Sequence, residues 1–474
     1  MTTAPHSCRN LGRQAAACAL AALLALSCAI AAPASAAFAD VRKADVIYGE
    51  TVEQRDLAVA AAPSIDAQFA LVTDADGTVY FERDATTPAQ IASITKVMTA
   101  VVVLDAVNEG VISLDTPVVV SEAAAWVGES SAGLAAYDEM DVDTALKALL
   151  VPSGNDAAVA LAETLGQIYL DNGTYQAESA EAAFVAAMNA KAAELGAVDS
   201  VYENPHGLDF DEHAGNLHSC AKDVASLIRY AMQNDVFRED VALGDTTITV
   251  TRGGEPTEVY LEATDQFPDY SEYAIGVKTG FTELAGACFS AATNKDGLEL
   301  YAAVLNSSSE EQRFVDAETL TSWVYDHLKT YPLAHSVQSV TMDGQEVPLI
   351  AYVACNAWID KTVPATLADP DAAIEVFDLN GNVSQSVEFL QPDGTVRAGD
   401  KVGVITFSQR NNVVAEMDLV ATEDVAAPNF IEGVTIWWER LVRGITGGSQ
   451  TAENVVVNET PLIVDKTSQS SQSS

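Results

Sequence analysis

The most informative stretch of this 474-residue chain is residues 91–100, which read IASITKVMTA. Within it, Ser93 and Lys96 lie one helical turn apart, so their side chains project from the same face if Ser93 opens a helix. A lysine placed in this way can take the proton of the serine, provided that the lysine is neutral near pH 7. Burial, the positive end of its own helix and a second cation would each lower the pKa of Lys96, and Lys278 is the candidate for that cation.

Two further short motifs follow later in the chain. Ser-Gly-Asn at residues 153–155 lies between two predicted helices and offers a hydroxyl and an amide from one tight turn. Lys-Thr-Gly at residues 278–280 ends a predicted strand, where it would present a cation and a hydroxyl beside a glycine that lets a ligand approach the backbone. Ser-x-x-Lys alone also fits a capped surface helix, but three motifs in this order are hard to obtain by accident.

The pattern around the motifs predicts an α/β domain. Residues 67–83 hold two apolar runs around an Asp/Gly turn, which predicts a hairpin, and residues 93–110 predict a long, mostly buried helix. Further helices are predicted at residues 143–150, 156–165, 180–195 and 313–330, and strands at residues 273–277, 288–293 and 298–305. Strands at both ends with helices between them predict one sheet that is closed from distant segments.

The first 39 residues have the pattern of a secretory signal peptide. Arg9 and Arg13 make a basic start, residues 14–39 carry no charge, and small residues near the end offer a cleavage site. Cys28 raises lipidation as an alternative, although Leu26 lies one position too close to it for a good lipobox. The sequence therefore predicts a secreted protein that works outside the cytoplasm, at the cell wall or the outer face of the cytoplasmic membrane.

The charge and cysteine content exclude two further classes. The formal net charge is -44, and such an acidic surface repels nucleic acid and other polyanions. After the leader, Cys220, Cys288 and Cys355 remain, which allows at most one internal bridge and excludes a disulfide scaffold.

The C-terminal part changes character. Short alternating strands separated by Asp/Gly and Pro/Asp/Gly turns predict a small all-β domain, and apolar residues then recur at helical spacing before a polar end. The predicted organisation is a signal peptide at residues 1–39, a linker at 40–62, an enzyme-type domain at 63–332, an all-β domain at 333–427, an amphipathic helix at 428–446 and a disordered polar tail at 447–474.

The three ordered motifs resemble those of penicillin-binding proteins and serine β-lactamases. Longer matches make the chain similar to the low-molecular-mass D-alanyl-D-alanine carboxypeptidases, from about Phe69 to Tyr331. These matches lie at residues 91–100, 152–158, 204–208, 278–282, 285–286 and 313–314. The resemblance implies a β-lactamase/transpeptidase-like fold, with an antiparallel sheet flanked by helices plus a helical subdomain, followed by the all-β domain and the terminal helix.

The resemblance also implies a reaction. Ser93 would attack the carbonyl between the two terminal D-alanines of a peptidoglycan stem pentapeptide, with Lys96 as general base. Ser153 would relay a proton to the leaving nitrogen, and Asn155 would hold Lys96 and the peptide backbone. Water would then release the acyl-enzyme.

Substrate binding is implied for the third motif. Lys278 and Thr279 would bind the free C-terminal carboxylate, and Gly280 would let the substrate approach the strand. The backbone N–H groups of Ser93 and Phe281 would form the oxyanion hole. No metal or cofactor is implied, and β-lactam antibiotics are expected as covalent inhibitors.

Alternatives remain at several points. A serine β-lactamase would need a Glu-x-x-x-Asn stretch after residue 155 for fast deacylation, and none follows at a suitable distance. An inactive penicillin-binding fold could instead serve as a wall-binding or structural protein. His206, His213 and His218 could be read as a metal cluster, although their spacing matches no common site. The amphipathic helix could lie on a membrane or pack on the β domain.

Overall fold

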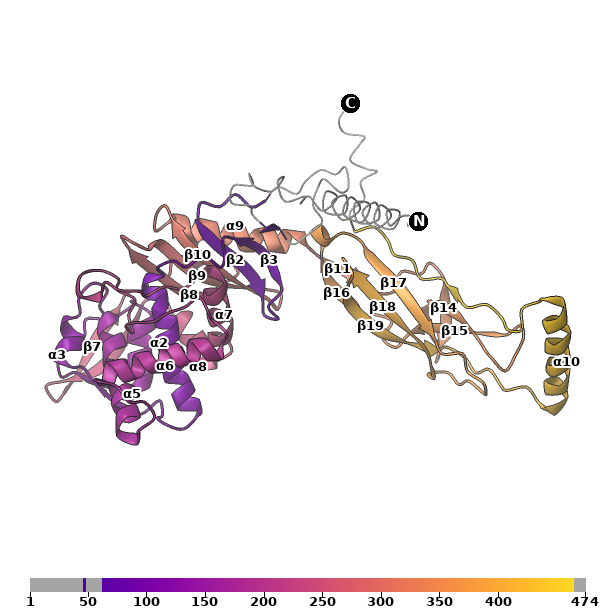
Figure 1. The fold of residues 1–474 in the computed structure, drawn as a ribbon, viewed down its shortest axis with the longest axis horizontal. Coiled ribbons are helices and arrows are strands. Elements are labelled where there is room, and N and C mark those ends of the chain that lie inside the picture. Colours follow the sequence, from indigo (N-terminus) through magenta and orange to yellow (C-terminus); the bar gives the residue numbers. More distant parts are fainter. Residues whose placement is uncertain (1–45, 48–61, 464–474) are drawn as a thin grey trace, which may run out of the picture. The chain divides into compact units, whose positions relative to one another are not determined.

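The computed structural model describes residues 46–47 and 62–463 of the chain (Figure 1). The predicted signal peptide, Cys28 and residues 464–474 of the predicted tail lie outside the described residues. Most of the predicted linker also lies outside them, except residue 62 and strand β1 (Val46–Ile47), which pairs with β3.

A six-stranded antiparallel sheet combines early and late strands of the enzyme-type part. Its order is β1-β3-β2-β10-β9-β8. Its longer strands are β2 (Phe69–Asp74), β3 (Val79–Arg83), β8 (Ala274–Thr282), β9 (Gly286–Lys295) and β10 (Leu298–Ser307). Because β2 pairs with β10, the predicted N-terminal hairpin and the later strands form one sheet, which confirms the predicted closure from distant segments.

The two faces of this sheet are covered by different helices. In β2, Ala70 and Val72 belong to the apolar cluster beneath α9 (Gln312–His327), whereas Leu71 belongs to the cluster that contains α7 (Ala221–Ala231). This alternation follows from the period of two along a strand. The predicted α/β fold class is confirmed.

Helix α2 (Thr95–Asn108) lies inside the helical subdomain. Residues 95–104 are all buried, and the helix contacts α4 (Val142–Leu150), α5 (Asn155–Asn172), α6 (Ala180–Glu194) and α7. A helix that is apolar around its whole circumference is stable only in the interior, so this observation confirms the predicted buried helix.

A second, four-stranded sheet was not predicted from the sequence. It consists of β4 (Pro117–Val119), β5 (Glu139–Asp141), β6 (Thr246–Arg252) and β7 (Glu255–Leu261), in that order. Its signal was available, because Ile248 and Val250 alternate with threonines ahead of the Gly253-Gly254 turn. The helices α3 (Glu122–Trp126), α7 and α8 (Asp235–Val241) were not predicted from the sequence either.

The C-terminal part contains the predicted β domain. Its six-stranded sheet has the order β17-β18-β19-β15-β14-β20. The strands are β14 (Ala351–Ala354), β15 (Thr362–Leu367), β17 (Val383–Phe389), β18 (Lys401–Gln409), β19 (Asn412–Ala421) and β20 (Val455–Val456). Two smaller pairs are β11 (Leu328–Pro332) with β16 (Ala373–Phe377), and β12 (Ser339–Met342) with β13 (Gln345–Pro348). Strand β11 begins at Leu328, five residues before the predicted start of the β domain at residue 333, and it already pairs with β16 of the C-terminal part.

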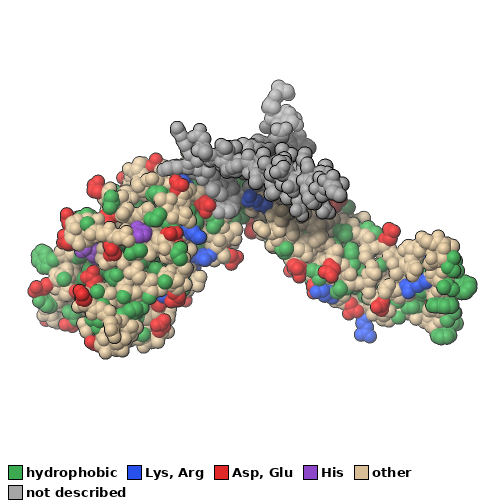
Figure 2. Space-filling view, viewed as in Figure 1, with side chains coloured by type: hydrophobic (Ala, Val, Ile, Leu, Met, Phe, Trp, Pro, Cys, Tyr) green, Lys and Arg blue, Asp and Glu red, His purple; other side chains and the backbone are tan. Residues whose placement is uncertain are grey.

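The predicted amphipathic helix is α10 (Phe430–Thr446), which begins with a capping box of Asn429 and Glu432. Its exposed apolar side chains gather at one edge of the view in Figure 2. They are Phe430, Ile431, Val434, Trp437, Trp438, Leu441, Val442 and Ile445. Within residues 46–47 and 62–463, none of the helices has both the length and the apolar character needed to span a bilayer.

The chain after α10 differs from the predicted disordered tail. Val455 and Val456 pair with β14 as strand β20, and Asn458 is buried. The Asn458 side chain accepts from the backbone N–H of His335 at 2.7 Å and donates to the carbonyl of Leu333 at 3.0 Å. The polar composition concealed this segment because it is held by hydrogen bonds to the β domain more than by apolar burial.

All three cysteines that follow the leader are free and buried. Burial raises the pKa of each thiol, to about 11 for Cys220 and about 12 for Cys288. They behave as small core residues and not as thiolate nucleophiles.

Candidate active site

Ser93 lies at the point where the chain enters the buried helix. It is in a short 3-10 turn (Ala92–Ile94) that leads directly into α2, and the amine of Lys96 lies 2.7 Å from its Oγ. The structure therefore brings the first predicted pair into direct contact. Ala92 holds φ at 46°, in the left-handed region, so the turn that presents Ser93 is a constrained one.

Lys96 is completely buried beside the nucleophile. Burial lowers its pKa well below the ordinary value of a lysine, the nearby charge of Lys278 lowers it further, and Asp156 acts in the opposite direction. The amine also donates to the backbone carbonyl of His206 at 3.0 Å, which fixes its position. A neutral lysine amine in this place has a lone pair that can accept the serine proton.

The second motif forms the turn between α4 and α5. Ser153 adopts φ 62°, and both its Oγ and the Oδ1 of Asn155 are buried without a hydrogen-bond partner among the described residues. A side chain at Gly154 would place its Cβ 2.6 Å from the carbonyl of Ala148, so only glycine fits there. Unpaired buried polar atoms at a cleft are costly and are expected where a ligand supplies the partners.

A loop that precedes this turn is tied to it by hydrogen bonds. Asn155 donates its backbone N–H to the carbonyl of Ser130 at 2.8 Å and its side-chain amide to the carbonyl of Gly128 at 2.9 Å. The buried carboxylate of Asp156 accepts from the Ser131 hydroxyl at 2.6 Å and from the backbone of Ala132 and Leu134. Residues 128–134 are therefore held against the turn of the second motif, and Glu129 and Ser130 line a cleft there.

The third motif lies in the middle of β8, which continues to Thr282, and not at the end of a strand as predicted. Thr279 donates to the hydroxyl of Thr264 at 2.9 Å. A Cβ on Gly280 would lie 2.7 Å from the carbonyl of Ile91 and 3.1 Å from the backbone nitrogen of Ser93. Strand β8 thus passes directly against the backbone that carries the nucleophile.

Lys278 lies behind the cleft wall, almost completely buried. Burial and the guanidinium of Arg313 lower its pKa to about 7, while the carboxylate of Asp265 opposes the change. A lysine with such a pKa gains much by meeting an anion, because the anion compensates its desolvated charge.

One cleft of about 750 Å³ unites these residues, and it also contains groups that sequence reasoning missed. Its walls include Ser93, Ser153, Asn155, Thr264, Thr279, Gly280, Phe281 and Arg313. Arg313 is buried at the start of α9, and its Nη1 lies 3.4 Å from the carbonyl of Gly280. Arg313 belongs to the family-like Arg-Phe pair at residues 313–314, but no sequence pattern indicated that α9 would place it at the cleft.

The three histidines that could be read as a metal cluster, His206, His213 and His218, do not line this cleft. His206 and His213 touch through their rings, with 4.7 Å between centroids, and the Nδ1 of His218 lies 2.6 Å from the carbonyl of Asn216. Burial, followed by the charge of Lys96, lowers the pKa of His206 to about 2, so this ring is neutral.

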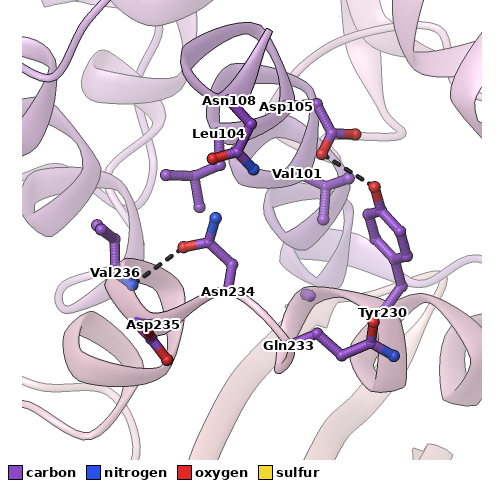
Figure 3. Close-up of a pocket in the computed structure, with 10 residues that line it drawn as sticks. Val101, Leu104, Asp105, Asn108, Tyr230, Gln233, Asn234, Asp235 and Val236 are labelled. Carbon is purple, nitrogen blue, oxygen red and sulfur yellow. Dashed lines mark hydrogen bonds between the residues drawn. The ribbon is translucent and has the colours of Figure 1, made fainter.

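A second cavity, of about 450 Å³, lies at the other end of α2 (Figure 3). There Asp105 accepts from the hydroxyl of Tyr230 at 3.0 Å and pairs with Lys191 at 2.9 Å. Asn234 caps α8 by accepting from the backbone of Val236, as Figure 3 shows. These side chains are engaged with each other or with a helix end, and none of the three sequence motifs contributes a residue to the lining of this cavity.

Comparisons with known proteins agree with this geometry. A family model described as D-alanyl-D-alanine carboxypeptidase, Peptidase S11, matches residues 56–309. The D-alanyl-D-alanine carboxypeptidase DacF of Bacillus subtilis is 25% identical over 372 residues, which are 77% of this chain and 87% of DacF. DacC of Escherichia coli is 27% identical over 381 residues, which are 78% of this chain and 86% of DacC.

Solved structures show the same fold. The Streptomyces K15 DD-transpeptidase is 27% identical, and the match covers 56% of this chain and all of that protein with a TM-score of 0.51. The D-alanyl-D-alanine carboxypeptidase DacD from Francisella tularensis covers 80% of this chain with a TM-score of 0.52. At 21% identity, DacD supports the fold alone, including a C-terminal part beyond the domain shared with the K15 enzyme.

Proposed function

We propose, because this chain belongs to the Peptidase S11 family of D-alanyl-D-alanine carboxypeptidases of peptidoglycan metabolism, that it removes the terminal D-alanine from stem pentapeptides. The observation that carries the proposal is the 2.7 Å contact between the Oγ of Ser93, which lines the cleft, and the wholly buried amine of Lys96. A serine beside a lysine of lowered pKa is an activated nucleophile.

Acylation begins with proton transfer from Ser93 to Lys96. The freed Oγ attacks the carbonyl between the two D-alanines, and a C–O bond forms while the carbonyl oxygen becomes an oxyanion. The backbone N–H groups of Ser93 and Phe281 stabilise this oxyanion, and one such donor contributes about 3 kcal/mol to the transition state. The close approach of Gly280 to Ser93 supports the pairing of these two donors.

Release of D-alanine requires a proton on its nitrogen. Ser153 relays that proton from the Lys96 ammonium, the C–N bond breaks, and an ester on Ser93 remains. The unpaired Oγ of Ser153 and the unpaired Oδ1 of Asn155 support this role, because both atoms are free to bond with Lys96 or the substrate. Water then attacks the ester, Lys96 accepts a proton again, and free serine returns.

The free carboxylate of the substrate binds to Lys278, Thr279 and Arg313. Thr279 and Arg313 line the cleft beside Gly280, and the amine of Lys278 lies behind this wall, where it donates to the carbonyl of Thr279 at 3.0 Å. This carboxylate requirement makes the enzyme a carboxypeptidase, and penicillin occupies the same place with its own carboxylate.

Release of D-alanine from a pentapeptide tests the proposal. Wild-type protein is expected to release it, and Ser93→Ala is expected to lose at least about 10³-fold in kcat/KM. The exposed Ser113→Ala protein is the matched control and should keep wild-type activity. Penicillin labelling without D-alanine release would favour the inactive, wall-binding alternative, and rapid penicillin turnover would favour a β-lactamase.

We further propose that α10 docks on a membrane surface outside the cytoplasm. Its eight exposed apolar side chains suit the interface, while Glu432 and Glu439 balance Arg440 and Arg443 and weaken attraction to anionic lipid. The Trp437→Ala, Trp438→Ala double variant should sediment less with phospholipid vesicles than wild type, and Trp126→Ala should sediment equally. Equal sedimentation of the double variant would contradict this docking.

A further inference from the structure

Trp126 is the most exposed of the five tryptophans in the chain. Its side chain is 83% exposed at the end of α3, and it makes no hydrogen bond or ring contact with another described residue. Tryptophan is highly buried on average in folded proteins, so an exposed indole is an informative exception.

A second exposed ring is hydrogen-bonded to the same helix. Tyr137 is 65% exposed, and its hydroxyl donates to Glu122 Oε1 at 2.8 Å. Glu122 and Trp126 are four residues apart on α3, hence on one face of it. Trp126 and the hydrogen-bonded pair of Tyr137 and Glu122 therefore lie on the same face of α3.

A short loop joins this surface to the active-site cleft. Gly128 follows Trp126 by two residues, so their Cα atoms are at most about 7 Å apart. The carbonyls of Gly128 and Ser130 both accept from Asn155, which fixes the loop on either side of Glu129. Glu129 and Ser130 line the cleft with Ser93, so the position of Trp126 is fixed relative to the nucleophile.

The chemistry of this surface suits a sugar. The C–H groups on one face of a pyranose ring pack against the electron-rich face of an aromatic ring. The equatorial hydroxyl and N-acetyl groups of such a sugar need polar partners at its edge, and Glu122, Glu129 and Ser130 offer them. A polyanion is excluded by the same carboxylates.

We propose that Trp126 and Tyr137 form a binding site for the amino-sugar chain that carries the stem peptide. This inference rests on the proposed function, because the peptide tethers the sugar to the cleft. An extended pentapeptide spans at most about 17 Å, so a peptide bound at Ser93 holds its sugar within that distance of the nucleophile. The loop of residues 127–131 connects Trp126 to the cleft, and its five residues span at most about 17 Å.

Kinetics on two soluble substrates test the site in the full chain. The substrates are a free stem pentapeptide and the same peptide on its amino-sugar disaccharide. Wild type should have the lower KM for the disaccharide-linked substrate. Trp126→Ala should raise that KM about tenfold, the loss of one stacking contact, and leave kcat and the free-peptide KM unchanged. Trp126→Phe should retain part of the preference, and Trp437→Ala, the same change on α10, should retain all of it.

A binding measurement separates this inference from the proposed function. Titration with the peptide-free disaccharide should change the tryptophan fluorescence of wild type and of Trp437→Ala, and should leave Trp126→Ala unchanged. An unchanged substrate preference in Trp126→Ala, or no fluorescence change in wild type, would overturn the sugar site. If neither substrate released D-alanine, the proposed function would fail, while the fluorescence titration would still decide the sugar site.

Discussion

Two lysines buried behind the wall of the cleft need different charge states. Lys96 acts as a base only when it is neutral, whereas Lys278 attracts a carboxylate only when it is charged. Burial is the largest cause that lowers the pKa of both, and each has a second cation as its next cause, Lys278 for Lys96 and Arg313 for Lys278. Repulsion from a neighbouring cation therefore adds to burial in lowering the pKa of each of the two lysines.

The pH dependence of substrate binding should report on Lys278. Its pKa is lowered to about 7, so it loses its charge as the pH rises through that value, and the KM for pentapeptide should increase above about pH 7. Arg313→Gln removes the second cause that lowers the pKa of Lys278, so the increase in KM should begin at a higher pH. A uniform rise in KM at all pH values, from the loss of the arginine itself, would leave this shift visible. Arg397→Gln, an exposed arginine of the β domain, should leave the profile in place. A profile that kept its midpoint in Arg313→Gln would exclude this coupling.

Gly280 should be essential for the position of β8 against Ser93 but not for the folding of the domain. A methyl group there would lie 2.7 Å from the carbonyl of Ile91 and so push β8 away from Ser93. We expect Gly280→Ala to lose about 100-fold or more in kcat/KM, because misplacement near 1 Å has effects of that size. Gly244→Ala, where nothing lies within 4 Å, is the control. Near wild-type activity of Gly280→Ala would show that β8 does not press on the nucleophile.

At the scale of elements, prediction succeeded where one physical signal dominated. The apolar run of α2 and the two apolar runs of β2 and β3 around an Asp/Gly turn were sufficient, because these elements are largely buried as their composition predicts. Strand β8 was predicted too short, since its functional residues 278–282 lack the apolar run that marks residues 274–277. At residues 278–282, polar residues and a glycine of the third motif take positions where apolar residues would have marked a strand.

The segment after α10 should stabilise the β domain. Asn458 is buried, and its side chain makes hydrogen bonds to His335, Leu333 and Gln385. Asn458→Ala leaves those groups without partners and should lower the free energy of unfolding of this domain by about 2–3 kcal/mol, measured by denaturant unfolding. Asn412→Ala, at an exposed strand end, should change it by less than about 0.5 kcal/mol. An equal free energy of unfolding for the two variants would show that the segment after α10 does not stabilise the β domain.

At the scale of the whole molecule, three short motifs were enough to predict which residues meet. Ser93, Ser153 and Thr279 come from an entry turn, an interhelical turn and a strand, and all three line one cleft. Arg313 and Thr264 line it as well, but their places depend on how α9 and the segment before β8 pack. Such packing contacts have no local sequence pattern, so only the assembled fold reveals them.

The identity of the acylated residue is the most direct test of the account. Protein incubated with a β-lactam, then digested and mapped by mass spectrometry, should carry one adduct, on Ser93, and Ser93→Ala should carry none. The rate of adduct formation should increase with pH through the lowered pKa of Lys96. An adduct on another side chain, or undiminished labelling of Ser93→Ala, would contradict the claim that Ser93 is the nucleophile.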